Sequence, residues 1–342
     1  MIKFFRNIRQ NLLTENKFSK YILYAIGEIF LVVVGILIAL NINNNNELEK
    51  NKQAVVSSLK EIQSNLLDDI KVSQGVLETY LINDSIQKKI FDFKNPSTIA
   101  DFKNKKITKL GNYYDNFVIN KNGYENLMRQ IDIMPKKYEP ILKDLKRLYV
   151  SLNETINTYN ERIRSTVYSN IDFMYTQDWE IYRRKHKQIS NEEANYFIND
   201  NRYKNYIIKF MNDSGNLCDI SMSYCIKAIE TYEKIDSLVD IKNSERPLHL
   251  LGKVNTNELK EYLGTYQLKG ERDILKKLYV KNNIIYCDFS DSEFNYINTF
   301  RNYKINDILY LNNAGVWKFN RDSLGGIGIE YTGDPWEFTK IK

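Results

Sequence analysis

The chain is poor in the residues that interrupt helices and in those that build most metal sites. Its 342 residues include 5 prolines, 14 glycines, 3 cysteines and 2 histidines. So few prolines, together with long stretches of helical polar and apolar periodicity, predict a mostly helical chain. Three cysteines are too few for a disulfide framework, which needs dense and usually even cysteine usage.

The three cysteines are interpreted as buried free thiols. If Cys218 and Cys225 share one helix, they lie two turns and about 10 Å apart, beyond the reach of a disulfide. A single bridge that includes Cys287 stays open on the count alone.

The remaining chemistry-bearing residues predict no catalytic, metal or cofactor site. Neither His186 nor His249 has a glutamate three residues before it, so the Glu-x-x-His spacing of di-iron bundles is missing. The glycine-rich run at 325–328 stands between predicted strands, with no following helix to present its amides to a phosphate. We therefore expect no enzyme activity, no cofactor and no metal.

One long apolar segment, residues 21–42, reads YILYAIGEIFLVVVGILIALNI. This length suffices for a hydrocarbon core about 30 Å thick. Its Ile, Leu, Val and Phe residues together favour insertion by about 4 to 8 kcal/mol, against a cost of about 3 for Glu28. A cleaved signal peptide is the alternative, but the segment exceeds the usual signal core and residues 39–41 lack an A-x-A site. The sequence therefore favours a retained transmembrane anchor.

Charges on either side of the span predict its orientation. The acidic residues Glu47 and Glu49 follow it closely, whereas five basic residues precede it: Lys3, Arg6, Arg9, Lys17 and Lys20. Positive flanks stay on the cytoplasmic side, so the bulk of the chain is expected to be periplasmic, on the outer side of an inner membrane. The leader, residues 1–20, has the pattern of a basic amphipathic helix on an anionic leaflet.

Three residues inside the span are candidates for function or helix packing. Glu28 is a carboxylate inside the span, and such a residue suggests a site for ion passage or for a polar partner. Protonation, or a local water defect in the bilayer, would also accommodate it without any transport role. Gly35 and Ala39 form a small-xxx-small pair that lets two helices approach closely, a pattern that also occurs by chance. The pair Gly35 and Ala39 would allow a homo-oligomer to form through the span, and we expect no ion pathway.

The leader and span carry a family resemblance. The span contains Lys-Tyr-x-x-Tyr-Ala-x-Gly-Glu-Ile at 20–29, followed by Gly-Ile-x-Ile-Ala-Leu-x-Ile-Asn at 35–43. This pattern resembles the start of an uncharacterised membrane-anchored family of Bacteroidota, a domain of unknown function, over about the first 50 residues. Members often have a tryptophan soon after the span, where this chain has asparagines at 43–46. The resemblance implies an inner-membrane address and assigns no reaction.

Four apolar stripes at helical spacing follow the span. The first includes Val55, Leu59, Ile62, Leu66, Ile70, Val76 or Leu77, and Tyr80, and the second includes Tyr138, Ile141, Leu145, Leu148, Leu152, Ile156, Tyr159, Ile163 and Val167. A third helix is expected at about 192–212, and a fourth carries Leu217, Ile220, Tyr224, Ala228, Ile229, Tyr232, Ile235 and Leu238. These helices are predicted to form an antiparallel bundle over residues 43–243.

The period changes from 3.6 to 2 after a linker at 244–257. Leu278 and Val280 lead to Asn282-Asn283, a two-residue turn signal, and alternation resumes at Ile285. Further turns are expected at Gly325-Gly326 and at 333–335. Roughly eight short strands fit into residues 258–342, the size of a small antiparallel β-barrel.

The tail resembles a known domain as well. It contains Glu-Leu-x-x-Tyr-Leu-Gly-Thr-Tyr at 258–266 and Val-x-x-Phe-x-Arg-Asp-x-x-Gly at 316–325. These motifs are similar to those of the lipocalin-like domain appended to some β-lactamase-type hydrolases. The resemblance implies a barrel that is filled by its own side chains or holds a small apolar ligand, and we favour the filled barrel.

The expected protein is therefore an α+β multidomain chain with a transmembrane helix, a helical bundle and a small barrel. Its predicted role is a non-enzymatic interaction, scaffold or sensor module with an unknown envelope protein partner; a carrier of a small apolar ligand is the alternative. Nucleic acid is not an expected partner, because the basic runs at 103–106 and 183–187 lack interleaved aromatics and fall outside the cytoplasm in the predicted topology.

Overall fold

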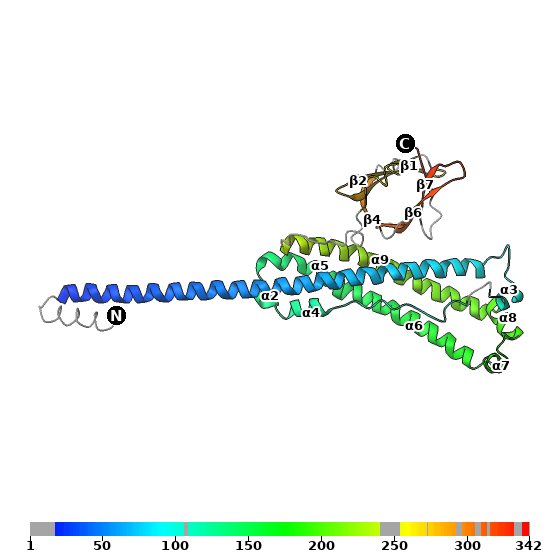
Figure 1. Cartoon of the computed structure of the whole chain (residues 1–342), viewed down its shortest axis with the longest axis horizontal. Helices are drawn as coiled ribbons and strands as arrows, with labels where there is room; N and C mark the ends of the chain where they lie inside the picture. The colour runs from blue at the N-terminus through cyan, green and yellow to red at the C-terminus, as the bar shows by residue number, and fades with distance from the viewer. Residues whose placement is uncertain are drawn as a thin grey trace.

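The computed structural model describes residues 18–341, except 106–108, 240–253, 272, 292–295, 305–308, 313–314 and 332–336. The described chain forms a helical N-terminal part and a C-terminal antiparallel sheet (Figure 1). Three predicted features lie outside it: residues 1–17 of the leader, His249 with most of the linker, and the turn at 333–335.

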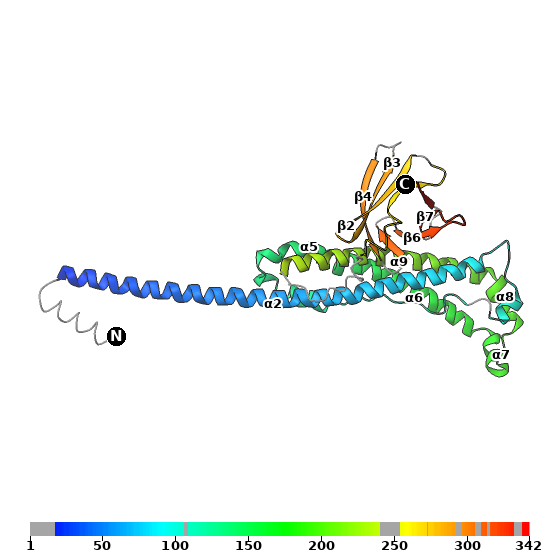
Figure 2. The same ribbon diagram turned by 45° about the horizontal axis from the view of Figure 1, so that its top comes forward.

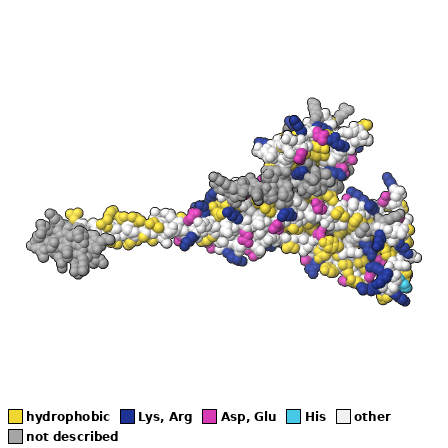
Figure 3. Space-filling model, in the orientation of Figure 1, with side chains coloured by type: hydrophobic (Ala, Val, Ile, Leu, Met, Phe, Trp, Pro, Cys, Tyr) yellow, Lys and Arg dark blue, Asp and Glu magenta, His cyan; other side chains and the backbone are white. Residues whose placement is uncertain are grey.

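A single helix, α2 (Phe18–Ile90), joins the apolar segment to the folded part. Its 73 residues give a length of about 110 Å. The first part of α2 projects as an isolated arm whose apolar side chains are exposed, and Lys, Arg, Asp and Glu become frequent only beyond it (Figures 1 and 3). By length and composition, α2 is able to cross a membrane.

The second part of α2 enters the core of the helical part. Val55, Leu59, Ile62, Leu66 and Ile70 are all fully buried, which confirms the first predicted stripe. No proline or glycine falls between the apolar arm and this stripe, and the asparagines at 43–46 continue the helix. The arm and the core are consequently parts of one unbroken rod.

The remaining helices follow α2 along the chain. They are α3 (Ile99–Lys103), α4 (Asn122–Met128), η1 (Ile131–Ile133), η2 (Lys136–Ile141), α5 (Leu142–Lys146), the π-helical turn η3 (Arg147–Leu152), α6 (Asn153–Tyr175), α7 (Asp178–His186), α8 (Asn191–Asn199) and α9 (Asn201–Val239). From η2 through α5 and η3 to α6 the chain is continuously helical. Its apolar face is buried at Ile141, Leu145, Leu148 and Ile156, as the second stripe predicted.

The long helices α2 and α6 both pack along α9, and α9 runs opposite to the other two (Figures 1 and 2). The amide of Gln63 near the start of the buried part of α2 donates to Asp236 near the end of α9 at 2.7 Å. Farther along, Arg162 of α6 pairs with Asp213 of α9 at 2.7 Å. The side chains of these pairs fix the antiparallel register.

The predicted division into a helix at 192–212 and another at 217–238 is wrong. The structure has the short helix α8 and then one 39-residue helix, α9, that passes through Gly215 without a break. A glycine inside a helix costs about 1 kcal/mol, which is less than the burial of apolar side chains on both sides of it contributes. The four-helix antiparallel bundle is therefore not confirmed.

The C-terminal strands follow each other in an up-and-down sheet. They are β1 (Gly264–Leu268), β2 (Ile274–Lys281), β3 (Ile284–Asp291), β4 (Tyr296–Lys304), β5 (Leu309–Asn312), β6 (Gly315–Arg321), β7 (Ile327–Tyr331) and β8 (Glu337–Lys340). Each pairs antiparallel with the next, and β8 pairs with β1, so the sheet curls into a closed barrel. Asn282 and Asn283 both have positive φ, as a type I′ turn requires, which confirms the predicted hairpin.

The two motifs of the sequence resemblance meet at one end of the barrel. The ring of Tyr262 lies 4.5 Å from that of Phe319 between centroids, and Arg321 pairs with Glu261 at 2.7 Å. The Tyr266 hydroxyl donates to the Tyr262 carbonyl oxygen at 2.5 Å. The motif residues thus hold the turn before β1 against β6, which is a structural role.

The barrel sits on α9 (Figure 2). The guanidinium of Arg301 in β4 makes two hydrogen bonds to Glu233 of α9, at 2.7 and 2.9 Å. The hydroxyl of Tyr303 donates to Glu230 at 3.3 Å, and its ring is buried with the helical core. The helical part and the barrel are therefore joined by an apolar contact flanked by a bidentate ion pair.

Candidate functional site

The three candidates of the span share one face of α2. At 100° per residue, Glu28, Gly35 and Ala39 fall within about 40° of one another around the helix axis. A Cβ atom added to Gly35 would meet nothing within 4 Å. The structure thus places the carboxylate and both small residues on one accessible strip of the arm.

A buried polar cluster lies farther along α2, inside the helical core. Asp69 as a whole is 2% exposed. The Tyr224 hydroxyl of α9 donates to its Oδ2 at 2.7 Å, and the Asn120 backbone N–H donates to its Oδ1 at 3.1 Å. Burial raises the pKa of Asp69 to about 6 despite these two hydrogen bonds, which act in the opposite direction. Asp69 is therefore a proton-binding group that titrates near neutral pH.

Tyr149, in the π-helical turn η3, borders the same cluster. Its ring stacks on Tyr124 with centroids 4.7 Å apart, and burial, together with the negative charge of Asp69, raises its pKa. Its hydroxyl is buried without a hydrogen-bond partner among the residues that the structure describes. π-helical turns often occur at functional sites, and here one holds a phenol beside a titratable carboxyl.

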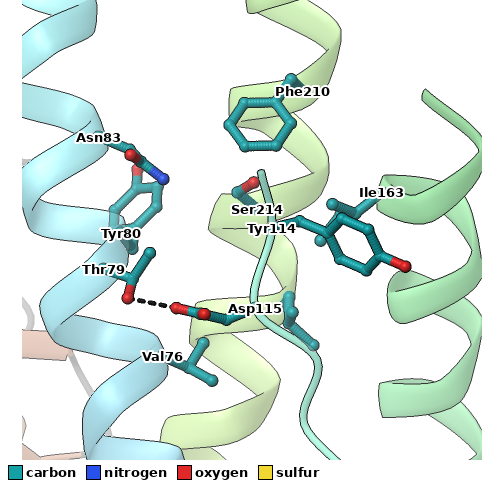
Figure 4. Close-up of a pocket in the computed structure, with 10 residues that line it drawn as sticks. Val76, Thr79, Tyr80, Asn83, Tyr114, Asp115, Ile163, Phe210 and Ser214 are labelled. Carbon is teal, nitrogen blue, oxygen red and sulfur yellow. Dashed lines mark hydrogen bonds between the residues drawn. The ribbon is translucent and has the colours of Figure 1, made fainter. Parts of the chain in front are cut away.

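A small pocket opens between α2, α9 and the segment that connects α3 to α4. Figure 4 shows Thr79, Tyr80 and Asn83 of α2 facing Ser214 of α9, with Asp115 from the connecting segment between them. The Thr79 hydroxyl donates to the Asp115 carboxylate. The pocket has a volume of about 20 Å³, close to that of a single water molecule and far below the volume of metabolite sites.

The three cysteines and His186 lie apart from the polar cluster and the pocket. Cys218 and Cys225 of α9 and Cys287 of β3 are all buried and free, as predicted. Burial raises the pKa of Cys218 to about 12 and that of Cys225 to about 11, so neither forms a reactive thiolate at neutral pH. His186 is exposed at the end of α7, against the ring of Tyr182. Within the described part of the chain, no three His, Cys, Asp or Glu residues are grouped so that they could hold a metal ion.

Comparison with known proteins gives no match for this chain among protein-family models, curated proteins or solved structures.

The buried polar cluster was not predicted from the sequence, although one signal for it was present. Asp69 stands three residues after Leu66 and one before Ile70, so it falls on the edge of the apolar stripe. A carboxylate on the buried side of a helix needs a polar partner. The partners Asn120 and Tyr224 come from distant segments, and no spacing rule within α2 could have named them.

Proposed function

We propose that this chain is a single-span inner-membrane protein whose periplasmic part is a non-enzymatic interaction, scaffold or sensor module. The observation that carries this proposal is the continuity of α2 from an exposed apolar arm into a fully buried core stripe. A helix of this kind holds the folded part at a fixed distance from the bilayer. The basic leader and the acidic residues after the span support the orientation with the N-terminus in the cytoplasm.

The resemblance of the leader and span to a membrane-anchored Bacteroidota family supports the same address. The lipocalin-like motifs support a structural barrel. On the described strands, Tyr266, Trp317 and Phe338 are at most 1% exposed. Large side chains of this kind fill the interior of a small barrel, which favours the filled barrel over a carrier of an apolar ligand.

Asp69 supports a sensing role within this proposal. Its pKa of about 6 lies inside the range of pH that a compartment outside the cytoplasm experiences. Its partners come from α9 and from the segment before α4. A change in its charge therefore acts on contacts between α2 and both neighbours, and α2 is the helix that continues into the span.

Self-association through the span is part of the proposal and has a direct test. Replacing Gly35 with leucine is expected to reduce the crosslinked dimer of the full chain in membranes by about tenfold, because the side chain separates two closely packed helix backbones. Val33→Leu is the matched control, since residue 33 is about 160° away around the helix. Its dimer yield is expected to stay at the wild-type level.

Equal dimer yields for Gly35→Leu and the wild type would count against association through this face. The membrane anchor itself would not be affected by that result.

A further inference from the structure

The segment that links α4 to α6 closes the end of the helical part nearest the arm of α2. Figure 1 shows the chain passing from α4 to α5 at this end. The amide of Gln130 donates to the Ser58 hydroxyl of α2 at 3.2 Å, and Lys234 of α9 donates to the Pro140 carbonyl oxygen at 2.7 Å. We call residues 129–147 the collar, because they contact α2 and α9 where α2 leaves the folded part.

The collar is basic and partly apolar. Its acidic residues are Asp132, Glu139 and Asp144, whereas its basic residues are Arg129, Lys136, Lys137, Lys143, Lys146 and Arg147, all exposed. Ile131 and Ile133 are 40% and 45% exposed.

Two lysines of α9 cancel one negative charge of the collar and so raise its net positive charge. Lys227 and Lys234 both pair with Asp144, at 2.7 and 2.6 Å. One of the three acidic residues is thus already neutralised from outside the collar.

The stretch of α2 between the span and the collar adds no net charge. It carries Glu47, Glu49, Lys50 and Lys52. The positive charge at this end of the molecule therefore comes from the collar, with exposed isoleucines among the cations. A surface that combines exposed basic side chains with exposed apolar side chains binds anionic membrane surfaces.

The length of α2 places the collar within reach of lipid headgroups. From Ile42, at the end of the span, to Ser58 the helix rises about 24 Å. The headgroup zone occupies about 5 to 8 Å of this distance, and a helix tilt of about 20° lowers one side of the collar further. Of the remaining distance of about 16 to 19 Å, an extended lysine side chain covers about 6 Å. The gap of about 10 to 13 Å that is left before any tilt is little longer than a Debye length of about 8 Å.

We infer that the collar docks on the anionic lipid headgroups of the membrane that α2 spans. This inference rests on the proposed membrane anchor. Docking fixes the tilt of α2 and, with it, the orientation of the helical part above the bilayer. The partner is the lipid surface itself, recognised through phosphate charge by the collar cations and through the headgroup boundary by Ile131 and Ile133.

The test uses the full chain in lipid nanodiscs. A fluorophore is attached to Glu139→Cys, an exposed collar position, while the native cysteines are buried. Quenching by a lipid with a nitroxide on its headgroup is compared between discs of phosphatidylcholine alone and discs with one-third phosphatidylglycerol. Each cation near such a surface favours docking by about fivefold, so we expect at least fivefold stronger quenching in the anionic discs. In 1 M salt, where the Debye length is about 3 Å, this difference should disappear.

Matched variants identify the residues responsible. Replacing Lys136, Lys137, Lys143 and Lys146 with glutamine should abolish the effect of anionic lipid. Replacing Arg184, Lys185 and Lys187 with glutamine at α7, the end of the helical part far from the arm (Figure 1), should leave it unchanged. Equal quenching in both kinds of disc would contradict docking of the collar on anionic lipid and would not affect the proposed membrane anchor. A chain that failed to insert into the discs at all would overturn both.

Discussion

Replacing Gly123 with alanine is expected to destabilise the helical part by about 1 to 3 kcal/mol. Gly123 is buried near the start of α4, where the chain passes directly over α2. A Cβ atom at this position would lie 2.7 Å from the backbone nitrogen of Ile62 and 3.0 Å from the backbone carbon of Glu61. Backbone atoms of a packed helix cannot move aside, so α4 must shift away from α2. Urea unfolding of the full chain in detergent, followed by circular dichroism, measures the loss.

Gly75→Ala is the matched control for this experiment. Gly75 also lies in the helical core region, on α2, but a Cβ atom added there would meet nothing within 4 Å. Alanine in the middle of a helix is favoured over glycine by about 0.5 to 1 kcal/mol, so this variant should be more stable than the wild type. Equal stabilities for the two variants would show that α4 does not approach α2 as closely as described.

Asp69→Asn should remove a step in stability between about pH 4 and pH 6. The ordinary carboxyl pKa of 3.8 is raised to about 6 in the folded chain. The folded state therefore binds a proton over a range of pH in which the unfolded chain has lost it. Stability falls as the pH rises through this window, and above it the buried charge costs about 3 kcal/mol relative to the protonated form.

Urea unfolding at several pH values, from pH 4 to pH 8, measures this effect as the difference between wild type and variant. Asparagine keeps one oxygen, which accepts from the Asn120 backbone N–H, and its amide NH2 takes the place of Oδ2 and donates to the Tyr224 hydroxyl oxygen. Its charge does not change with pH. The difference should therefore grow in favour of the variant as the pH rises to 6 and then level off. Asp68→Asn, at the exposed neighbouring position, is the matched control. A flat difference for Asp69→Asn would show that the buried carboxyl does not titrate in this range.

Periodicity in the sequence predicted most of the core correctly. The stripes that begin at Val55 and Tyr138 are buried because a helix with one apolar face has to cover it. The Asn282-Asn283 turn was predictable because few residues other than glycine and asparagine adopt positive φ cheaply. These features depend on local rules, which a single sequence contains.

The features that were missed depend on contacts between distant segments. The continuity of α9 through Gly215 was not predicted, because a glycine among polar residues is typical of a helix end. Arg162 of α6 pairs with the buried Asp213 at this point, and Tyr80 of α2 lies 3.5 Å from where a Cβ of Gly215 would be. Neither neighbour could be identified from residues 212–216 themselves.

The same limit applies to the candidate sites. The candidates of the span could be found from the sequence, because a charged or small residue stands out among large apolar ones. They are Glu28, Gly35 and Ala39. The cluster at Asp69 and the collar at 129–147 were not found, because the first depends on residues from three segments and the second on where α4 and α5 lie relative to the arm. Both need the three-dimensional arrangement.

Protease treatment of intact spheroplasts that make the full chain with a tag at its C-terminus tests the proposed membrane topology. We expect protease added outside to remove the helical part and the barrel and to leave a membrane fragment that contains the leader and the span. A tag that stays protected until the cells are lysed would contradict it. So would a mature protein whose first residue lies after Asn41.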